Sequence, residues 1–293
     1  MTQKCDLVID SKSLLGEGAL WDHNRKRLLF VDIEKHLLYF FDPATDDLGS
    51  IDTGQRIGTV VPRQDGGLLV ALEKTVAVLD PGTERLETVL EVETDLPHNR
   101  FNDGKCDPAG RFWVGTMAMD ASEGTASLYR IDGDCKIKRI LQGITISNGI
   151  AWSHDGTRLY YIDTPTRKID CLDYDIQSGD VDNRRTVIEI PPAMGYPDGM
   201  TIDARGWLWI AMFGGAAVTC WNPDEERLIA SYPIPANNVT SCAFGGDALD
   251  ELYVTTARIQ MTDVEVRKYP QAGGVFRLKP GAVGVPCFEF KTR

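Results

Sequence analysis

The chain has 293 residues, of which 43% are hydrophobic, with 28 glycines and 15 prolines. Its formal net charge of −12 argues against nucleic acid and anionic membrane surfaces as partners. The N-terminus shows no apolar leader, and no run approaches the roughly 20 apolar residues of a membrane span, so we predict a cytoplasmic protein with no membrane partner.

An apolar strand pattern opened by a polar or glycine-containing turn recurs along the chain. The copies lie at residues 27–32, 67–72, 111–116, 158–163, 207–212 and 251–256. Successive copies are about 40 to 49 residues apart, a period typical of repeat architectures. Most copies are followed by a second strand that ends in a polar turn, so each unit supplies about four short strands, as in one propeller blade.

Six such units predict an all-β, six-bladed β-propeller. The repeats run on without a linker or low-complexity tract, which predicts one domain over residues 1–293. No segment combines helical periodicity with caps, so helix should be scarce. Residues 5–10 have strand character but precede the first repeat; we predict that they form the outermost strand of the last blade and close the ring.

The seven cysteines and four histidines show no C-x-x-C pair and no paired metal spacing. A G-x-S-x-G elbow and a phosphate-binding loop are also missing from the sequence. We therefore predict that most of the cysteines are reduced residues of the core or the surface.

Polar residues recur at one phase of the repeat. The first strand of each blade lines the propeller channel, so equivalent positions come together around the axis. Stepping back about nine to eleven residues from each strand copy leads to Glu17, Ile57–Gly58, Asn102, Asn148, Asp198 and Ser241. Most of these residues are followed by glycine, directly or one position later, which we expect to turn the backbone and leave room for a ligand.

Carboxylates that converge in a partly desolvated channel repel each other, and a divalent cation would relieve that repulsion. Two carboxylates and an amide oxygen are hard donors that suit Ca²⁺, Mg²⁺ or Mn²⁺ and can serve Zn²⁺ or Fe²⁺ less selectively. The alternative is that these side chains only make turn and cap hydrogen bonds. Because the residues recur as a matched set, we favour one divalent metal ion as cofactor.

Several motifs occur in an order shared with a known family. They are Asn-Arg-Phe-Asn-Asp-Gly-Lys at 99–105, Gly-Thr-Met-Ala at 115–118, Ile-Ser-Asn-Gly at 146–149, Pro-Asp-Gly at 197–199 and Val-Thr-Thr-Ala-Arg at 254–258. Over residues 15–276 the chain resembles the senescence marker protein, gluconolactonase and luciferin-regenerating enzyme family, which includes regucalcin-like sugar lactonases. The resemblance implies a six-bladed propeller with one catalytic divalent metal in its channel.

Carried over by motif, the resemblance makes Glu17, Asn148 and Asp198 the metal ligands and Arg100 and Asn102 the substrate contacts. Asp198 is then the catalytic residue that accepts a proton from the attacking water. We interpret Asp103 as a turn residue rather than a ligand. Where some members of the family place a substrate-binding glutamate, this chain has Met119, and Asp120 or Glu123 would have to replace it.

Together with the metal-site pattern, the resemblance implies a monomeric, metal-dependent enzyme that hydrolyses a sugar aldonolactone, with five or six carbons, to the aldonic acid. One alternative is hydrolysis of another ester, such as an organophosphate. A second is a non-catalytic, calcium-binding propeller. The Trp-Asp pair at 21–22 is not repeated at the blade period, which argues against an interaction propeller.

Overall fold

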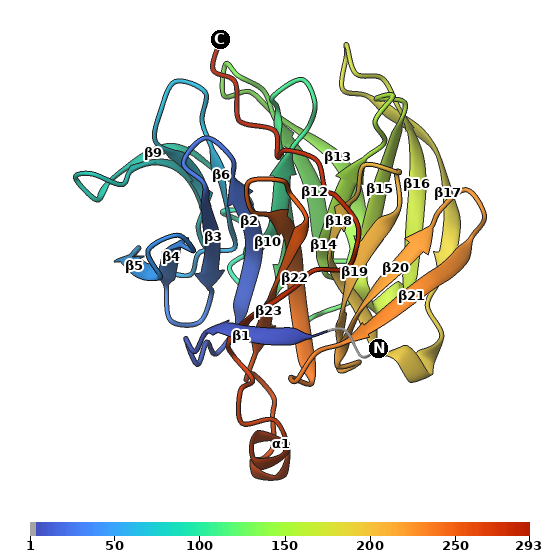
Figure 1. Ribbon diagram of the computed structural model, residues 1–293. Coiled ribbons are helices and arrows are strands. Elements are labelled where there is room, and N and C mark those ends of the chain that lie inside the picture. Colours follow the sequence, from blue (N-terminus) through green and yellow to red (C-terminus); the bar gives the residue numbers. More distant parts are fainter. Residues whose placement is uncertain (1–3) are drawn as a thin grey trace.

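The computed structural model describes residues 4–293, and in them six four-stranded antiparallel sheets surround a central channel (Figure 1). Each innermost strand contacts the innermost strands of both neighbouring blades, which closes the ring. The predicted all-β, six-bladed propeller is confirmed. Within the same residues the only helices are α1 (Asp263–Lys268) and the 3₁₀ turns η1 (Thr164–Thr166) and η2 (Pro192–Met194), so the expectation of scarce helix also holds. No helix in this part of the chain is long and apolar enough to span a membrane.

Blades 1 to 5 each use four consecutive strands, ordered from the channel outward. Blade 1 contains β2 (Gly16–Asp22), β3 (Arg27–Asp32), β4 (Leu37–Asp42) and β5 (Asp47–Asp52). Blade 2 contains β6 (Thr59–Pro62), β7 (Leu68–Ala71), β8 (Thr75–Asp80) and β9 (Arg85–Glu91). Blade 3 contains β10 (Asn99–Cys106), β11 (Phe112–Ala118), β12 (Ala126–Ile131) and β13 (Ile137–Ile144). In blades 4 and 5 the strands are β14 (Ser147–Trp152), β15 (Arg158–Asp163), β16 (Lys168–Tyr174), β17 (Val181–Glu189); and β18 (Tyr196–Ile202), β19 (Leu208–Phe213), β20 (Ala217–Asn222), β21 (Arg227–Pro233). The six strand copies found in the sequence are the second strands of the blades.

Blade 6 joins the two ends of the chain. Its inner strands are β22 (Asn238–Gly245), β23 (Glu251–Ala257) and β24 (Val275–Leu278), and its outermost strand is β1 (Cys5–Ile9). β1 runs antiparallel to β24, with Cys5 opposite Leu278. The predicted ring closure by the N-terminal strand is therefore confirmed.

The core lies in the sectors between neighbouring blades, because the second strands are apolar on both faces. β3 illustrates this pattern, since Leu28, Leu29 and Phe30 are all completely buried. Some polar side chains in this core are anchored by several hydrogen bonds. The buried Asp107 Oδ2, for example, accepts hydrogen bonds from Arg111 Nε at 2.6 Å and Trp113 Nε1 at 2.8 Å. The turns between first and second strands are thereby tied to the core.

The end of the chain crosses one end of the channel. Residues 283–291, here called the C-terminal strap, exchange backbone hydrogen bonds with Ala204, Leu249, Pro62 and Gly110, which belong to or adjoin four different blades. Cys287 Sγ also donates to the carbonyl of Trp21 at 3.1 Å. The innermost strands end on the side of the propeller that carries the strap and begin at the other end of the channel. The strap and the predicted site therefore lie at opposite ends of the channel (Figure 1).

Candidate metal and substrate site

Backbone irregularities occur at the phase where the sequence predicts the site. In the described residues, five of the six innermost strands shift register against their second strand, and the shifts lie between Glu17 and Leu20, Phe101 and Gly104, Asn148 and Ile150, Pro197 and Met200, and Val239 and Ser241. A bulge leaves a residue unpaired and redirects its side chain. The predicted polar residues therefore lie in or at the bulges of their strands. In β6, which has no register shift, Gly58 comes just before the strand and Ile57 is completely buried.

Gly18 has the left-handed backbone expected of a turn, with φ +61°, but two of the other glycines have a different role from the one expected. A Cβ on Gly149 would lie 2.7 Å from the carbonyl oxygen of Asp198, and one on Gly199 would lie 2.7 Å from Ser241 Oγ. Contacts this short are excluded, so glycine is required for neighbouring innermost strands to approach each other. The structure thus assigns these two glycines to blade packing rather than to room for a ligand.

Two side-chain oxygens of the candidate metal site lack any hydrogen-bond partner. Glu17, Asn148 and Asp198 are only 5–8% exposed. Asn148 Nδ2 donates to Thr164 Oγ1 at 3.0 Å, and this hydroxyl donates to the Pro197 carbonyl at 2.9 Å, which fixes the amide orientation. Within residues 4–293, Asn148 Oδ1 and Asp198 Oδ1 accept no hydrogen bond. An unsatisfied buried acceptor typically costs about 1–3 kcal/mol, so these atoms are suited to an external partner.

Asp103 supplies a third carboxylate, whose charge acts on Glu17 and Asp198 and which the sequence interpretation missed. Asp103 lies within β10 rather than in a turn, and its side chain is buried. Its Oδ1 accepts from the Gly104 backbone N–H at 2.8 Å, whereas its Oδ2 has no partner among the described residues. The Asn-Asp-Gly sequence is a strong turn signal, and only the register of β10 shows that the aspartate points inward.

The electrostatics of the three carboxyl groups reflect their burial and their mutual repulsion. Burial raises the pKa of Glu17 well above its usual range, and the charges of Asp198 and Asp103 raise it further. The pKa of Asp198 is likewise raised well above normal by burial and then by Asp103. Burial also raises the pKa of Asp103, although the charge of Lys105 lowers it. A cation in this part of the channel would offset all three effects.

The donor set fits a divalent cation only if the amide is included. In residues 4–293, no three His, Cys, Asp or Glu side chains lie close enough together to hold a metal. Glu17 and Asp198 supply two carboxylates, and Asn148 supplies an orphaned amide oxygen. This all-oxygen set matches the preference of Ca²⁺, Mg²⁺ and Mn²⁺.

Arg100 and Asn102 lie together on β10. Arg100 Nη1 donates to Asn102 Oδ1 at 2.8 Å and to the Phe101 carbonyl at 2.9 Å, while Asn102 Nδ2 donates to the Ser147 carbonyl at 2.8 Å. Burial lowers the pKa of Arg100 to about 10, so the guanidinium stays charged at neutral pH. No carboxylate in the described chain lies within 4.0 Å of it. Asn102 therefore orients a buried cation that lacks an ion-pair partner.

The loop that departs from the family pattern follows β11 at the same end of the blade. Ala118, the last residue of β11, pairs with Asn99 at the start of β10, next to Arg100. Met119 is 46% exposed. Asp120 Oδ1 accepts from the Ser122 backbone N–H at 3.1 Å and from its hydroxyl at 2.7 Å. Asp120 is thus held in a local turn rather than turned toward Arg100.

We predict that Asp103→Asn raises the melting temperature of the chelator-treated protein by about 3 °C, since relief of about 1 kcal/mol shifts Tm by about 2–4 °C at this size. A carboxyl group with a raised folded-state pKa stabilises the fold below its ordinary pKa, and this stabilisation is lost as pH rises through the raised value. Asparagine is uncharged, so the Asp103→Asn variant does not lose this stabilisation at pH 7. Thermal denaturation at pH 7 and at a series of lower pH values measures the effect, and the gain should shrink as the pH falls.

Asp107→Asn is the matched control for this measurement. Asp107 is equally buried, but Arg111, Trp113 and Tyr174 pair with it, so neutralising it should lower Tm. If Asp103→Asn lowers Tm as much as the control, Asp103 is a paired structural residue and the repulsion argument is wrong.

The ring of blades and the buried polar residues of the channel define the class as a six-bladed propeller. The sequence model described as SMP-30/Gluconolactonase/LRE-like region matches residues 15–258, and the chain belongs to this family. A protein named regucalcin from Danio rerio is 38% identical over 290 residues, covering 98% of both chains. A Bacillus subtilis protein named putative sugar lactone lactonase YvrE is 40% identical over 270 residues, covering 92% of both.

Solved structures agree with this assignment. A luciferin-regenerating enzyme superposes with a TM-score of 0.94 at 35% identity, covering 99% of both chains. A calcium-binding protein described as regucalcin, from Agrobacterium tumefaciens, also reaches a TM-score of 0.94, at 28% identity and 98% coverage of both chains. The resemblance that the motifs indicate is therefore confirmed at the level of the family.

Proposed function

We propose that the protein is a metal-dependent hydrolase that opens sugar aldonolactones to aldonic acids. The observation that supports this most is the pair of buried, unpartnered oxygens on Asn148 and Asp198, next to Glu17 in the channel. Arg100, a buried cation without an ion pair, lies on the neighbouring β10. The name of the Bacillus subtilis relative, a putative sugar lactone lactonase, points to the same chemistry.

Glu17, Asn148 and Asp198 are the residues that we propose hold the metal. A bound divalent cation polarises a carbonyl oxygen and lowers the pKa of water, which permits ester hydrolysis near neutral pH. The sequence and the site leave Ca²⁺, Mg²⁺, Mn²⁺, Zn²⁺ and Fe²⁺ as candidates, with the three hard ions favoured by the all-oxygen donors.

The remaining roles follow from charge and position. We propose that Asp198 accepts the proton of the attacking water, because it is the nearest carboxylate to the proposed metal position and a carboxylate can act as a general base. Arg100 binds the substrate and stabilises negative charge on the carbonyl oxygen and then on the product carboxylate. Asn102 holds the guanidinium in place and contacts the substrate with its remaining hydrogen-bonding capacity.

A lactone-hydrolysis assay with and without chelator tests this proposal. Glucono-, xylono- and arabinono-lactone should be opened by the protein, the activity should disappear with EDTA, and one of the five divalent ions should restore it. Opening of a phosphotriester but of no lactone would favour the organophosphate alternative. Tight metal binding without any hydrolysis would favour the calcium-binding alternative, which the description of the Agrobacterium tumefaciens protein suggests.

A prediction about substrate size rests on Met119. The thioether of Met119 is a weak hydrogen-bond acceptor, and Asp120 is held in place by Ser122. A distal sugar hydroxyl therefore lacks the hydrogen bond that a glutamate at this position would accept. We expect kcat/KM to favour a pentonolactone over gluconolactone, and Met119→Glu to shift that ratio by roughly one to two decades toward gluconolactone. The comparison of kcat/KM for xylono- and gluconolactone measures it. A wild-type preference of tenfold or more for gluconolactone that Met119→Glu leaves unchanged would contradict this role.

A further inference from the structure

A cavity lies under the C-terminal strap, at the end of the channel opposite the candidate metal site. Its volume is about 390 Å³. Its walls come from the last residues of the innermost strands, among them Trp21, Trp152, Ile202 and Phe244, and from Val285 of the strap. These side chains are apolar and aromatic. A cavity of this size and lining is typical of sites for small organic molecules.

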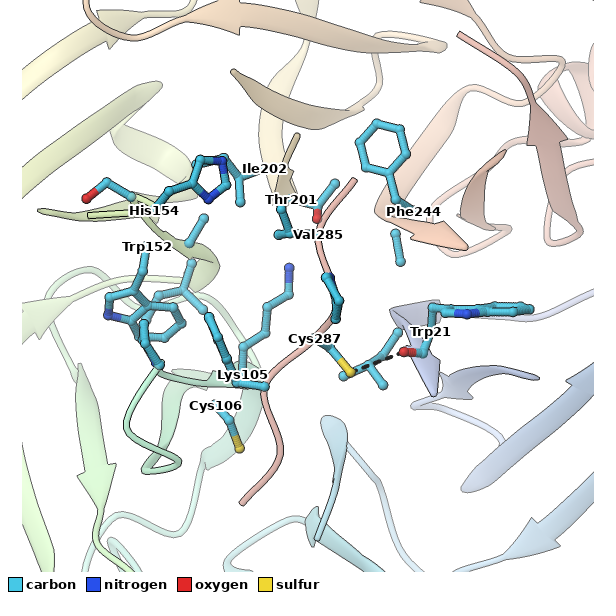
Figure 2. Close-up of a pocket in the computed structure, with 18 of the residues that line it drawn as sticks. Trp21, Lys105, Cys106, Trp152, His154, Thr201, Ile202, Phe244, Val285 and Cys287 are labelled. Atoms are coloured by element: carbon cyan, nitrogen blue, oxygen red, sulfur yellow. Dashed lines mark hydrogen bonds between the residues drawn. The ribbon is translucent and has the colours of Figure 1, made fainter. Parts of the chain in front are cut away.

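One cation extends into this apolar space. Figure 2 shows the side chain of Lys105 reaching from β10 toward the middle of the cavity, between Trp152 and Val285. Its ammonium group donates to the Met200 carbonyl. In the described part of the chain no carboxylate lies within 4.0 Å of it, although its charge lowers the pKa of the buried Asp103. Since an ammonium group has three N–H donors, two remain for a ligand.

We propose that this cavity is a binding site for a small organic monocarboxylate with an apolar, aromatic body. A partly buried, unpaired ammonium group favours an anionic head, and the walls favour an apolar remainder. The site is separate from the proposed lactone site, because its residues end the innermost strands whereas Glu17, Asn148 and Asp198 lie near their beginnings. A sugar acid, which carries a hydroxyl on every carbon except the carboxyl carbon, would leave these hydroxyls unpaired against the aromatic walls.

The charges at the cavity set the orientation of the ligand. Asp155 lines the cavity but is exposed at its rim, where Ser153 and Thr157 donate to its carboxylate. A second carboxylate placed at the rim would be repelled. The ligand carboxylate therefore lies inside at Lys105, and the aromatic body extends outward past Trp152 and Phe244 toward the strap.

Naphthalene-2-carboxylate is the probe, and naphthalene-2-carboxamide is its neutral counterpart. Calorimetry and quenching of tryptophan fluorescence on the full-length protein should show saturable, 1:1 binding of the carboxylate. Lys105→Met, which keeps length and removes charge, should raise the Kd of the carboxylate at least tenfold and change that of the amide less than twofold. Lys105→Arg should restore most of the affinity, because it restores the charge.

Three outcomes would overturn the proposal. The first is that the carboxylate shows no saturable binding at probe concentrations below the millimolar range. The second is that Lys105→Met lowers the affinity for the carboxylate and for the amide equally. The third is that EDTA abolishes binding of the carboxylate, which would place the probe at the other end of the channel. If Lys105→Met does not fold, Val285→Trp serves instead, because an indole at this half-buried strap position fills the cavity and should abolish binding of both probes. Binding unchanged in that variant would also overturn it. No lactone is present in these measurements, so their result is independent of the proposed hydrolase activity.

Discussion

Asp198→Asn should lower the turnover of lactone hydrolysis at least about a hundredfold while the propeller remains folded. The substitution keeps the size of the side chain and one oxygen, but it removes a negative charge from the proposed metal site and the proposed proton acceptor together. The fold should tolerate it, because Asp198 Oδ1 has no protein partner to lose within residues 4–293. Steady-state kinetics with saturating metal, together with thermal denaturation, measure both effects.

Ser241→Ala is the control for this prediction. Ser241 lies at the corresponding bulge of β22 and is equally buried, but it carries no charge and is not in the proposed donor set. Its turnover should stay within about threefold of wild type, as expected for a residue without a role in the transition state. Wild-type turnover by Asp198→Asn in a metal-free preparation would refute both the metal assignment and the proton acceptor.

Deleting residues 2–10 should lower the melting temperature by at least about 5 °C, because it removes the strand that completes blade 6. Leu7 packs on the core of blades 5 and 6, and Ile9 is buried against the core between blades 6 and 1. Full burial of a side chain such as that of Ile9 stabilises by about 1.5–3 kcal/mol, and about 1 kcal/mol corresponds to about 2–4 °C. The deletion also leaves β24 as an exposed edge, which favours self-association.

Two point variants separate packing from the loss of chain length. Ile9→Ala should lower Tm measurably, because its side chain is 5% exposed, whereas Asp10→Ala, at an exposed position, should leave Tm within about 1 °C of wild type. Differential scanning calorimetry and size-exclusion chromatography give the two readouts. An unchanged melting temperature in the truncated protein would show that β1 does not hold the ring together.

The architecture could be predicted from the sequence because each blade repeats the same local signals. An apolar strand such as 158–163 between polar turns is recognisable alone, and its repetition makes the propeller predictable. The role of residues 5–10 also follows from counting, since a leading strand without its own blade must pair with the last one. Both predictions depend on strand order, which the repeat specifies.

The candidate site could be predicted in outline only. Glu17, Asn148 and Asp198 share a phase of the repeat, but the sequence does not show that a bulge redirects each of them. The sequence around Asp103 indicates a turn, because Asn-Asp-Gly has the same local preference in a hairpin turn and in a bulged strand. Local chemistry is ambiguous in such cases, and the register with the neighbouring strand decides.

The cavity beneath the strap lies beyond prediction from pattern. Residues 283–291 have neither helical nor strand periodicity, and their positions depend on hydrogen bonds to blades that are far away in sequence, such as Gly284 to Leu249 and Phe290 to Pro62. Lys105 illustrates the same limit, since its charge matters only because no carboxylate in the described chain pairs with it.

The bulges suggest how this scaffold can change its chemistry. In five innermost strands a backbone bulge directs a residue into the channel. The number of these channel-facing positions, and their level along the channel axis, therefore do not depend on which side chains occupy them. Glutamate, asparagine, aspartate and serine already occupy equivalent positions in this one chain. Exchanges among polar residues at the bulges would therefore alter charge and ligand preference while blade packing, which depends on glycines such as Gly149 and Gly199, stays intact. The backbone of the propeller thus supplies a fixed set of channel-facing positions whose side chains can be exchanged. New activities can therefore arise on this fold one substitution at a time.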